Sequence, residues 1–180
     1  MAEGDTEQLV EKFYAPLYRF GLSLSRKEAD ASDLVQQTFC TWAAKGHQLR
    51  DKSKVKTWLF TTLYRDFLAT KRHDARFVET ENEADFAEPM QVASSVVDAL
   101  DAAIVQKALQ ALDERYRAPV TLFYMQQHSY REIAEILAIP IGTVMSRISR
   151  GKADLRKGLS DTAAFENRKI VSMEGEQARG

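Results

Sequence analysis

The chain has 180 residues, of which 44% are hydrophobic and 28% charged, and its formal net charge is −1. This balance fits an ordinary soluble protein with one or two small cores, and the apolar runs are too short for membrane insertion. The single cysteine, Cys40, excludes an intrachain disulfide and fits a reducing cytoplasm, and the N-terminus shows no signal-peptide pattern.

The small net charge conceals a strong segregation of charge along the chain. Residues 45–76 carry nine Lys and Arg against three Asp, and residues 140–158 carry five against one. Between these blocks, residues 77–106 contain seven acidic residues and neither Lys nor Arg. Two basic blocks on either side of an acidic segment predict two anion-binding surfaces, although ordinary solvated helix faces can also carry such charge.

The apolar spacing is helical from the first residues onward, and no strand pattern interrupts it. The first helix is expected at 6–25, with a bend near Pro16 because proline lacks a backbone N–H. A second helix is expected at 28–44 and a third at 53–73. The N-terminal part of the chain is therefore predicted to be a three-helix bundle.

The acidic segment divides into two parts. Residues 79–89 have few bulky apolar side chains and predict a flexible linker. Helical spacing returns at 96–112, and a further helix is expected at 113–127 with Asp113 as its N-cap. Pro119 inside that helix predicts a kink or a restart.

The run SYREIAEILAIPIGTVMSRISRGKADLRK predicts two short helices joined by a tight turn. The first helix, at 130–137, begins with Ser129 and Glu132 at the spacing of a capping box. The second begins near Pro140, whose fixed φ suits a first helical position. Ala138 stands where glycine often ends a helix, and a left-handed conformation there costs about 1 kcal/mol.

The second helix of this pair has two distinct faces. One is an apolar stripe, in which a glycine permits close approach of a neighbouring helix: Val144, Ile148, Gly151 and Leu155. The other is a polar and basic arc: Thr143, Ser146, Arg147, Arg150, Asp154 and Lys157. This layout is typical of a helix-turn-helix, whose second helix enters the DNA major groove. A solvated amphipathic helix is the alternative.

The same run resembles region 4 of the bacterial extracytoplasmic-function (ECF) sigma factors, members of the sigma-70 family. ADASDLVQQTFCTWAAK (29–45) resembles region 2.2, and KTWLFTTLYRDFLATKR (56–72) resembles regions 2.3 and 2.4. The resemblance implies an all-α protein with two small helical domains joined by a flexible acidic linker. The implied boundaries are region 2 at 5–76, the linker at 77–98 and region 4 at 99–159. The tail at 160–180 has mixed charge and weak periodicity and is expected to be poorly ordered.

The resemblance also implies a function. A protein of this family is a non-enzymatic, cytoplasmic specificity subunit without a cofactor. It binds the RNA polymerase core enzyme through the β′ clamp helices and the β flap, and it directs promoter-specific transcription initiation. An anti-sigma factor is a candidate further partner. Because Ser32 stands where the family commonly has glutamate, a regulatory kinase is a second candidate.

Three sets of residues carry over to this sequence by position. The first is expected to bind core polymerase: Asp33, Gln36, Gln37 and Phe39. The second, a cationic edge with an aromatic ring that suits single-stranded DNA, is expected to bind the −10 element: Arg50, Lys52, Ser53, Lys54, Lys56, Trp58, Arg65 and Arg72. The third is expected to bind the −35 element: Ser129, Thr143, Ser146, Arg147, Arg150 and Lys157. The alternative for Trp58 is a position in the hydrophobic core, and a core position is favoured more strongly for Trp42.

Two other classes of protein stay open on the sequence alone. A stand-alone helix-turn-helix regulator explains residues 129–157, but it gives no role to the first basic block or to the 33–39 motif. A nucleic-acid enzyme requires clustered carboxylates or a nucleophile beside a base, and the sequence offers neither pattern. The tail could be regulatory or inert.

Overall fold

The structure is a computed structural model that describes residues 3–77, 105 and 107–177, with side chains described at 7–73, 105 and 107–160. The expected linker from residue 78 onward and the first part of the helix expected at 96–112 lie outside the described residues. All regular secondary structure within the described ranges is helical, which confirms the predicted all-α fold.

The N-terminal half consists of three helices, α1 (Glu3–Ser25), α2 (Glu28–Lys45) and α3 (Val55–Phe77). Two short 3₁₀ turns, Gly46–Gln48 and Lys52–Lys54, join α2 to α3. The helix α1 stays helical through its internal proline. These helices lie where the apolar spacing predicts them, because each buries one apolar stripe against the other two.

A left-handed residue sets the turn between α1 and α2. Arg26 has φ 64°, and its N–H donates to the carbonyl of Leu22 at 3.0 Å, which ends α1. Gly21 faces Ala31 where the two helices cross, and an added Cβ would lie 3.5 Å from the Cα of Ala31, an ordinary van der Waals contact. The bundle core is built on these crossings from fully buried side chains: Leu17, Phe20, Val35, Leu59, Phe60 and Leu63.

The C-terminal half begins with helical residues 107–111, followed by α5 (Glu114–Val120) and a π-helical turn η3 (Thr121–Met125). The Asp113 carboxylate accepts from the N–H of Arg115 at 3.0 Å, so the predicted N-cap is confirmed. The predicted disturbance at Pro119 takes the form of the change from α to π winding that begins two residues later. A proline cannot donate to the preceding turn, and π turns are one way a helix absorbs such a gap.

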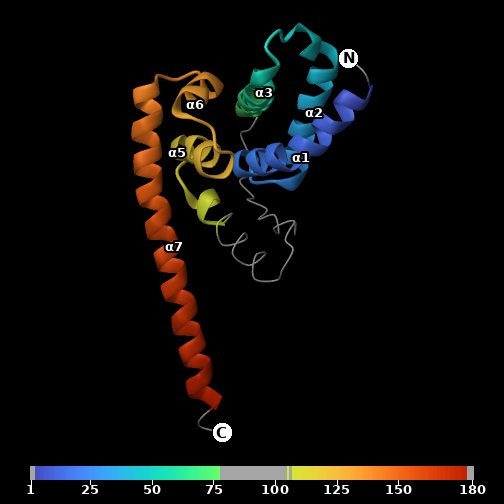
Figure 1. Cartoon of the computed structure of the whole chain (residues 1–180). Coiled ribbons are helices and arrows are strands. Elements are labelled where there is room, and N and C mark those ends of the chain that lie inside the picture. Colours follow the sequence, from blue (N-terminus) through green and yellow to red (C-terminus); the bar gives the residue numbers. More distant parts are fainter. Residues whose placement is uncertain (1–2, 78–104, 106, 178–180) are drawn as a thin grey trace.

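Two further helices complete the chain, α6 (Tyr130–Leu137) and α7 (Ile141–Gln177). The helix α7 runs well beyond the body of the molecule (Figure 1). The tail was expected to be poorly ordered from residue 160, and that expectation stays a prediction, although the backbone at 160–177 belongs to the same helix. Residues 160–177 contain no proline, so no residue there removes a backbone donor from a continuing helix.

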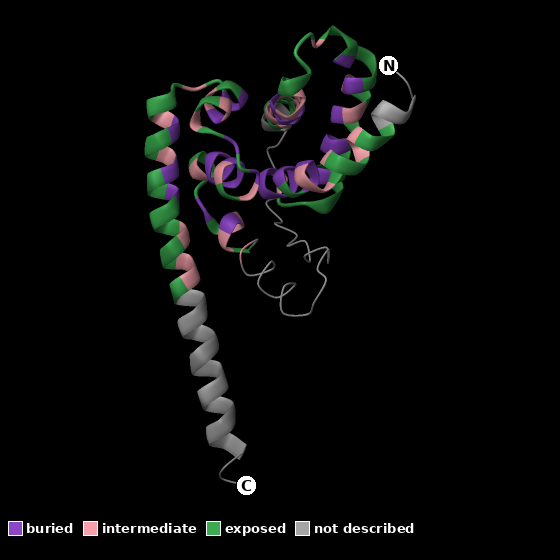
Figure 2. Cartoon of the chain, viewed as in Figure 1, coloured by how far each residue is buried: buried purple, intermediate pink, exposed green. Residues whose placement is uncertain are grey.

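The two halves pack against each other. The helix α3 lies against α6, and α1 lies against α5 and η3. One core cluster therefore contains residues of both halves, such as Leu63 and Leu17 together with Ile133 and Leu122. In Figure 2 the buried positions of α7 lie on its side toward α5 and α6. Within the described ranges, no helix has both the length and the apolar character needed to cross a bilayer.

We predict that Gly151→Ala destabilises the protein by about 1–2 kcal/mol. A Cβ at this position would lie 2.6 Å from Cγ2 of Val120 and 2.9 Å from Cβ of Tyr116, so α5 and α7 would have to separate. The matched control is Gly158→Ala on the same helix, where an added Cβ meets nothing within 4 Å and the change should be neutral or stabilising. Urea unfolding measures both variants, and equal stabilities would contradict the close approach.

Candidate nucleic-acid and polymerase interfaces

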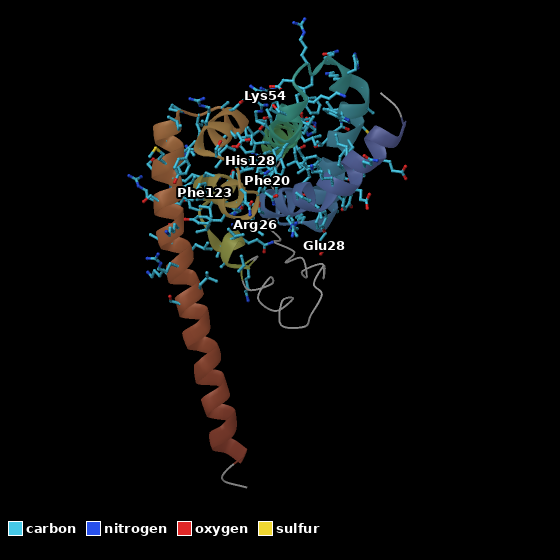
Figure 3. All side chains as sticks on the ribbon, in the orientation of Figure 1. Phe20, Arg26, Glu28, Lys54, Phe123 and His128 are labelled. Atoms are coloured by element: carbon cyan, nitrogen blue, oxygen red, sulfur yellow. The ribbon has the colours of Figure 1, made fainter. Side chains whose placement is uncertain are left out.

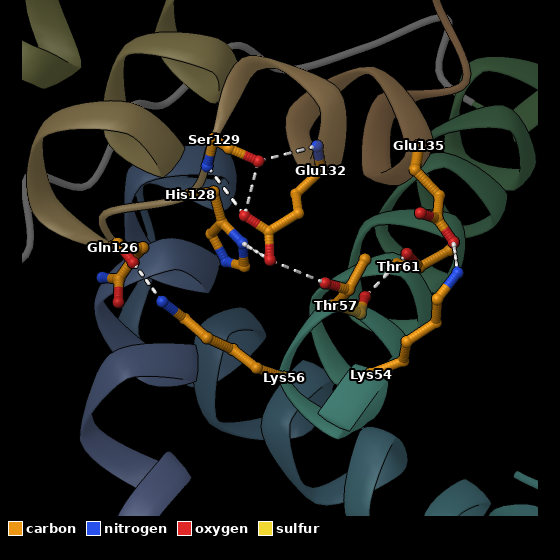
Figure 4. Close-up of polar contacts among 9 residues, drawn as sticks. All are labelled: Lys54, Lys56, Thr57, Thr61, Gln126, His128, Ser129, Glu132 and Glu135. Atoms are coloured by element: carbon orange, nitrogen blue, oxygen red, sulfur yellow. Dashed lines mark hydrogen bonds and ion pairs between the residues drawn. The ribbon is translucent and has the colours of Figure 1, made fainter. Parts of the chain in front are cut away.

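The helix-turn-helix has the local geometry that its sequence predicts. The N–H of Glu132 donates to the Ser129 hydroxyl at 3.3 Å, and the N–H of Ser129 donates to the Glu132 carboxylate at 2.8 Å, which completes the capping box (Figure 4). Ala138 adopts the left-handed conformation, with φ 52° and ψ 45°, and ends α6. The Pro140 carbonyl then accepts from Thr143 at 2.9 Å and begins α7.

The predicted apolar back of α7 is confirmed. Val144, Ile148 and Gly151 are buried and Leu155 is half-buried. The glycine packs directly on α5, as the close contacts above show. This packing fixes the rotation of α7 about its own axis, and it therefore decides which side chains face solvent.

The outward face of α7 is rotated by about 60° from the arc that the residue types suggested. Ser146, Arg150 and Lys157 are exposed, but Thr143 and Arg147 are half-buried. Arg147 leans toward α3 and lines a cleft of about 270 Å³ with residues of α3, α5 and α6: Tyr64, Asp113, Glu114, Arg115, Ala118, Pro119 and Leu137.

Sequence reasoning missed part of this face. Met145 is 52% exposed and Ile141 is 49% exposed, and Ser149 is exposed beside them. The missed signal was geometric, since the direction opposite the buried stripe on the helical wheel passes near Ser146 and Ser149 rather than Arg147. A choice of DNA-facing residues by charge alone favoured Arg147.

The predicted −10 residues fall into a loop group and a helix group. In the loop, Arg50, Lys52 and Ser53 are exposed, and Ser53 donates to Asp51 from both its N–H (3.0 Å) and its hydroxyl (2.6 Å). The hydrogen bonds from Ser53 lower the pKa of the Asp51 carboxyl. The loop is thus held by its own capping bonds with its cations directed to solvent.

The helix group does not form one uniform cationic edge. Arg65 and Arg72 on α3 are exposed, and Lys54 is exposed at its start, but Lys56 is half-buried. Trp58 is half-buried and lies edge-on to Trp42, with ring centroids 5.2 Å apart. The Trp58 ring is therefore part of the core packing, and a role for it in stacking on DNA stays a prediction.

The predicted polymerase-binding residues share one outer face of α2. Asp33, Gln36 and Gln37 are exposed at the i, i+3 and i+4 spacing of neighbours on a helix. Phe39 is half-buried and packs against the bundle core. The first three residues are available to a partner, while Phe39 mainly anchors the helix that presents them.

A buried histidine lies where the two halves meet. His128 is 2% exposed and lies edge-on to Phe60 of α3, with centroids 4.8 Å apart; in Figure 3 it lies between α6 and α3. Neither ring nitrogen has a hydrogen-bond partner among the described residues, although Nδ1 lies 3.9 Å from Oε1 of Glu132. Burial, with the charge of Lys56 nearby, lowers the pKa of His128 to about 4.

Comparison with known families covers both halves. The model of Sigma-70 region 2 matches residues 9–77, and the model of Sigma-70 region 4 matches residues 102–155. The ECF RNA polymerase sigma factor SigL of Mycobacterium tuberculosis (strain H37Rv) is 31% identical over 156 residues, which are 85% of this chain and 88% of SigL. This chain is an ECF sigma factor of the sigma-70 family.

Other relatives agree with this assignment. The ECF sigma factor SigW of Bacillus subtilis is 29% identical over 85% of this chain and 88% of its own. Among solved structures, the sigma factor RpoE of Bartonella quintana, in complex with the anti-sigma factor NepR, has a TM-score of 0.70 and 32% identity, and the match covers 87% of this chain and 97% of RpoE.

The family assignment decides between the open alternatives. ECF sigma factors are not enzymes, and they direct RNA polymerase to specific promoters. A stand-alone helix-turn-helix regulator does not explain the region 2 match, so that alternative is set aside together with the nucleic-acid enzyme. The structure thus gives this sigma factor two helical domains, region 2 and region 4, packed face to face.

We predict that acid weakens the packing of these two domains through His128. The packed state holds the neutral ring, with the pKa lowered from 6.5 to about 4. A water-exposed ring binds a proton more readily, so the contribution to stability is complete above pH 6.5 and declines as the pH falls toward 4. From pH 7 to pH 5 the loss should be about 2 kcal/mol.

The measurement is urea unfolding of the wild-type protein and of His128→Phe at several pH values. The phenylalanine ring fills the apolar site but cannot titrate, so the difference in stability between the two proteins should change over this pH range. Parallel pH profiles for the two proteins would contradict the assignment of this titration to His128.

Proposed function

We propose that region 4 of this sigma factor reads the −35 element with the outward face of α7 and that region 2 binds the −10 strand with the start of α3 and the loop before it. The observation that supports this most strongly is the pair of separate cationic surfaces, one on each matched sigma region. Arg150, Ser146 and Lys157 lie on the first surface, and Arg50, Lys52 and Lys54 lie on the second.

The exposed methionine adds a specific expectation for α7. Met145 and Ile141 offer apolar contact to thymine methyl groups, while Arg150 can bridge two acceptors of guanine. The small side chains between them, Ser146 and Ser149, let the helix lie close to the base edges. Arg147 keeps its predicted −35 role only if it turns away from the cleft it shares with α3.

We further propose that Asp33, Gln36 and Gln37 bind the β′ clamp helices of core polymerase and that region 4 also binds the β flap. The solved relative RpoE is in complex with an anti-sigma factor, and an anti-sigma factor is our first candidate for control of this chain. Ser32 is exposed beside Asp33, and a regulatory kinase is the second candidate. The location is cytoplasmic, because RNA polymerase acts there.

The test of this function is selection of promoter fragments by holoenzyme reconstituted from core polymerase and this protein. Selected fragments should share two short elements at a fixed spacing, and transcripts should begin a fixed distance downstream of them. Duplex binding by the free protein to a palindrome, without transcripts in the presence of core, would contradict the proposal and favour a stand-alone regulator.

For the −35 surface, we predict that Arg150→Ala weakens holoenzyme binding to the selected fragment by about 1–3 kcal/mol and affects a scrambled −35 sequence less. Lys107→Ala is the matched control, since it removes the same charge from an exposed position of region 4 outside α7. Filter binding or fluorescence anisotropy measures the affinity. An equal loss on every sequence would reassign Arg150 to a phosphate contact.

For the polymerase surface, we predict that Asp33→Lys lowers affinity for core enzyme about tenfold or more without changing the unfolding midpoint, because a reversed charge faces the partner. Glu11→Lys on α1 makes the same charge change at another exposed position and serves as the control. Competition for core against a labelled sigma factor measures both variants. Unchanged affinity of Asp33→Lys would remove this face from the core interface.

A further inference from the structure

A groove lies between the π-helical turn η3 and the middle of α7, and its volume is about 440 Å³. One described lining residue comes from η3 and the others from α7: Tyr124, Lys152, Leu155, Arg156, Leu159 and Ser160. The helix α7 leaves the body of the molecule just beyond this stretch (Figure 1). The volume lies within the range of about 300–1,000 Å³ that is usual for small-molecule sites.

The η3 wall of the groove is held in place by aromatic contacts. Phe123 stacks on Tyr130 of α6, with ring centroids 5.0 Å apart and an interplanar angle of 18°. Tyr124 meets the Phe123 ring edge-on at 4.9 Å and is itself 44% exposed. Tyr124 therefore presents its ring to the groove from a fixed position, and π-helical turns of this kind are frequent at functional sites.

The α7 wall has an apolar side next to a cationic side. At about 100° per residue, Leu155 and Leu159 lie beside Lys152 and Arg156 within an arc of about 100°. Both leucines are half-buried, and Leu155 packs against the core cluster that contains Val120. The apolar side is therefore anchored in the core of region 4, while part of each leucine stays open to the groove.

The two cations of this wall have no compensating charge. Among the described residues, neither Lys152 nor Arg156 forms an ion pair, and no carboxylate lines the groove. Asp154 lies about 160° from each of them around the helix. Free cations beside an exposed apolar wall favour a ligand that joins one negative charge to an apolar body.

We propose that this groove binds an amphipathic carboxylate of the fatty-acid class. The acyl chain lies against the two leucines and the tyrosine ring, and the carboxylate accepts hydrogen bonds from Lys152 and Arg156. A docked helix, about 10 Å across, needs a larger groove, and a DNA phosphate gives the apolar wall no role. None of the described lining residues belongs to the surfaces proposed above for promoter DNA or core polymerase.

The first experiment compares two soluble ligands with the same ten-carbon tail and opposite charge. Isothermal titration calorimetry of the full chain at low salt, below the concentrations at which these ligands form micelles, should give one saturable site for decanoate. Decyltrimethylammonium should bind at least tenfold more weakly, because its charge faces two cations. Absence of a saturable decanoate site, or equal affinity for the two ligands, would overturn the proposal.

The second experiment reverses the charge of the groove. The double variant Lys152→Glu, Arg156→Glu should bind decanoate at least tenfold more weakly and decyltrimethylammonium more tightly than the wild-type protein. Both positions are exposed, so the unfolding midpoint without ligand should stay close to that of the wild type. The matched control, Lys27→Glu with Lys107→Glu, makes the same charge change at exposed positions outside the groove. Equal losses in the two double variants would indicate a general charge effect and overturn the site.

The apolar wall has its own test. Leu159→Asn should weaken decanoate and decyltrimethylammonium by the same factor, because the tail is common to both ligands. Unchanged affinity would show that the tail does not lie in the groove, which overturns the proposal.

Promoter DNA and a lipid surface are the alternative occupants, and each gives a different result. If decanoate does not bind while the Lys152 and Arg156 reversal weakens binding to a duplex of about 30 base pairs, the two cations serve DNA phosphates. If decanoate does not bind while the protein sediments with phosphatidylglycerol vesicles through the same residues, the groove is a membrane contact. Either result overturns the proposal, whereas decanoate binding that is lost in the double variant supports it.

Discussion

The packing of α3 against α6 is the interaction on which the rest of this molecule depends. The helix α3 buries Leu59 and Leu63 in the region 2 bundle, and its neighbouring face meets region 4. Phe60 lies between the region 2 core and region 4. Its ring centroid is 5.4 Å from that of Phe20 of α1 and 4.8 Å from that of His128. The helix α3 thus packs in the core of region 2 and also provides the surface on which region 4 packs.

The features that the sequence predicts well are local. The capping box at Ser129, the left-handed Ala138, the cap at Asp113 and the close approach at Gly151 each depend on side chains within a few residues or on one stripe of one helix. Helix caps and close helix contacts of this kind depend on residue spacing and residue type, so they can be predicted without knowing the fold. The helix boundaries follow for the same reason.

The contact between the two domains could not be predicted in this way. The Lys54 ammonium lies 3.9 Å from Oε1 of Glu135, but the two residues are far apart in the chain, and each alone reads as an ordinary exposed charge. The position of His128 matches no metal-binding motif, and nothing in the surrounding sequence predicts that its side chain is buried between the two domains. The rotation of α7 is a similar case, since only the packing of Gly151 on α5 decides that Met145 rather than Arg147 faces outward.

The central claim is that regions 2 and 4 of the free protein pack against each other through α3 and α6. Its most direct test is the distance between spin labels at Arg19 of α1 and Lys152 of α7, both exposed, in a Cys40→Ser background. The claim predicts one short, narrow distance distribution for the free protein. A long and broad distribution in the free protein would contradict it.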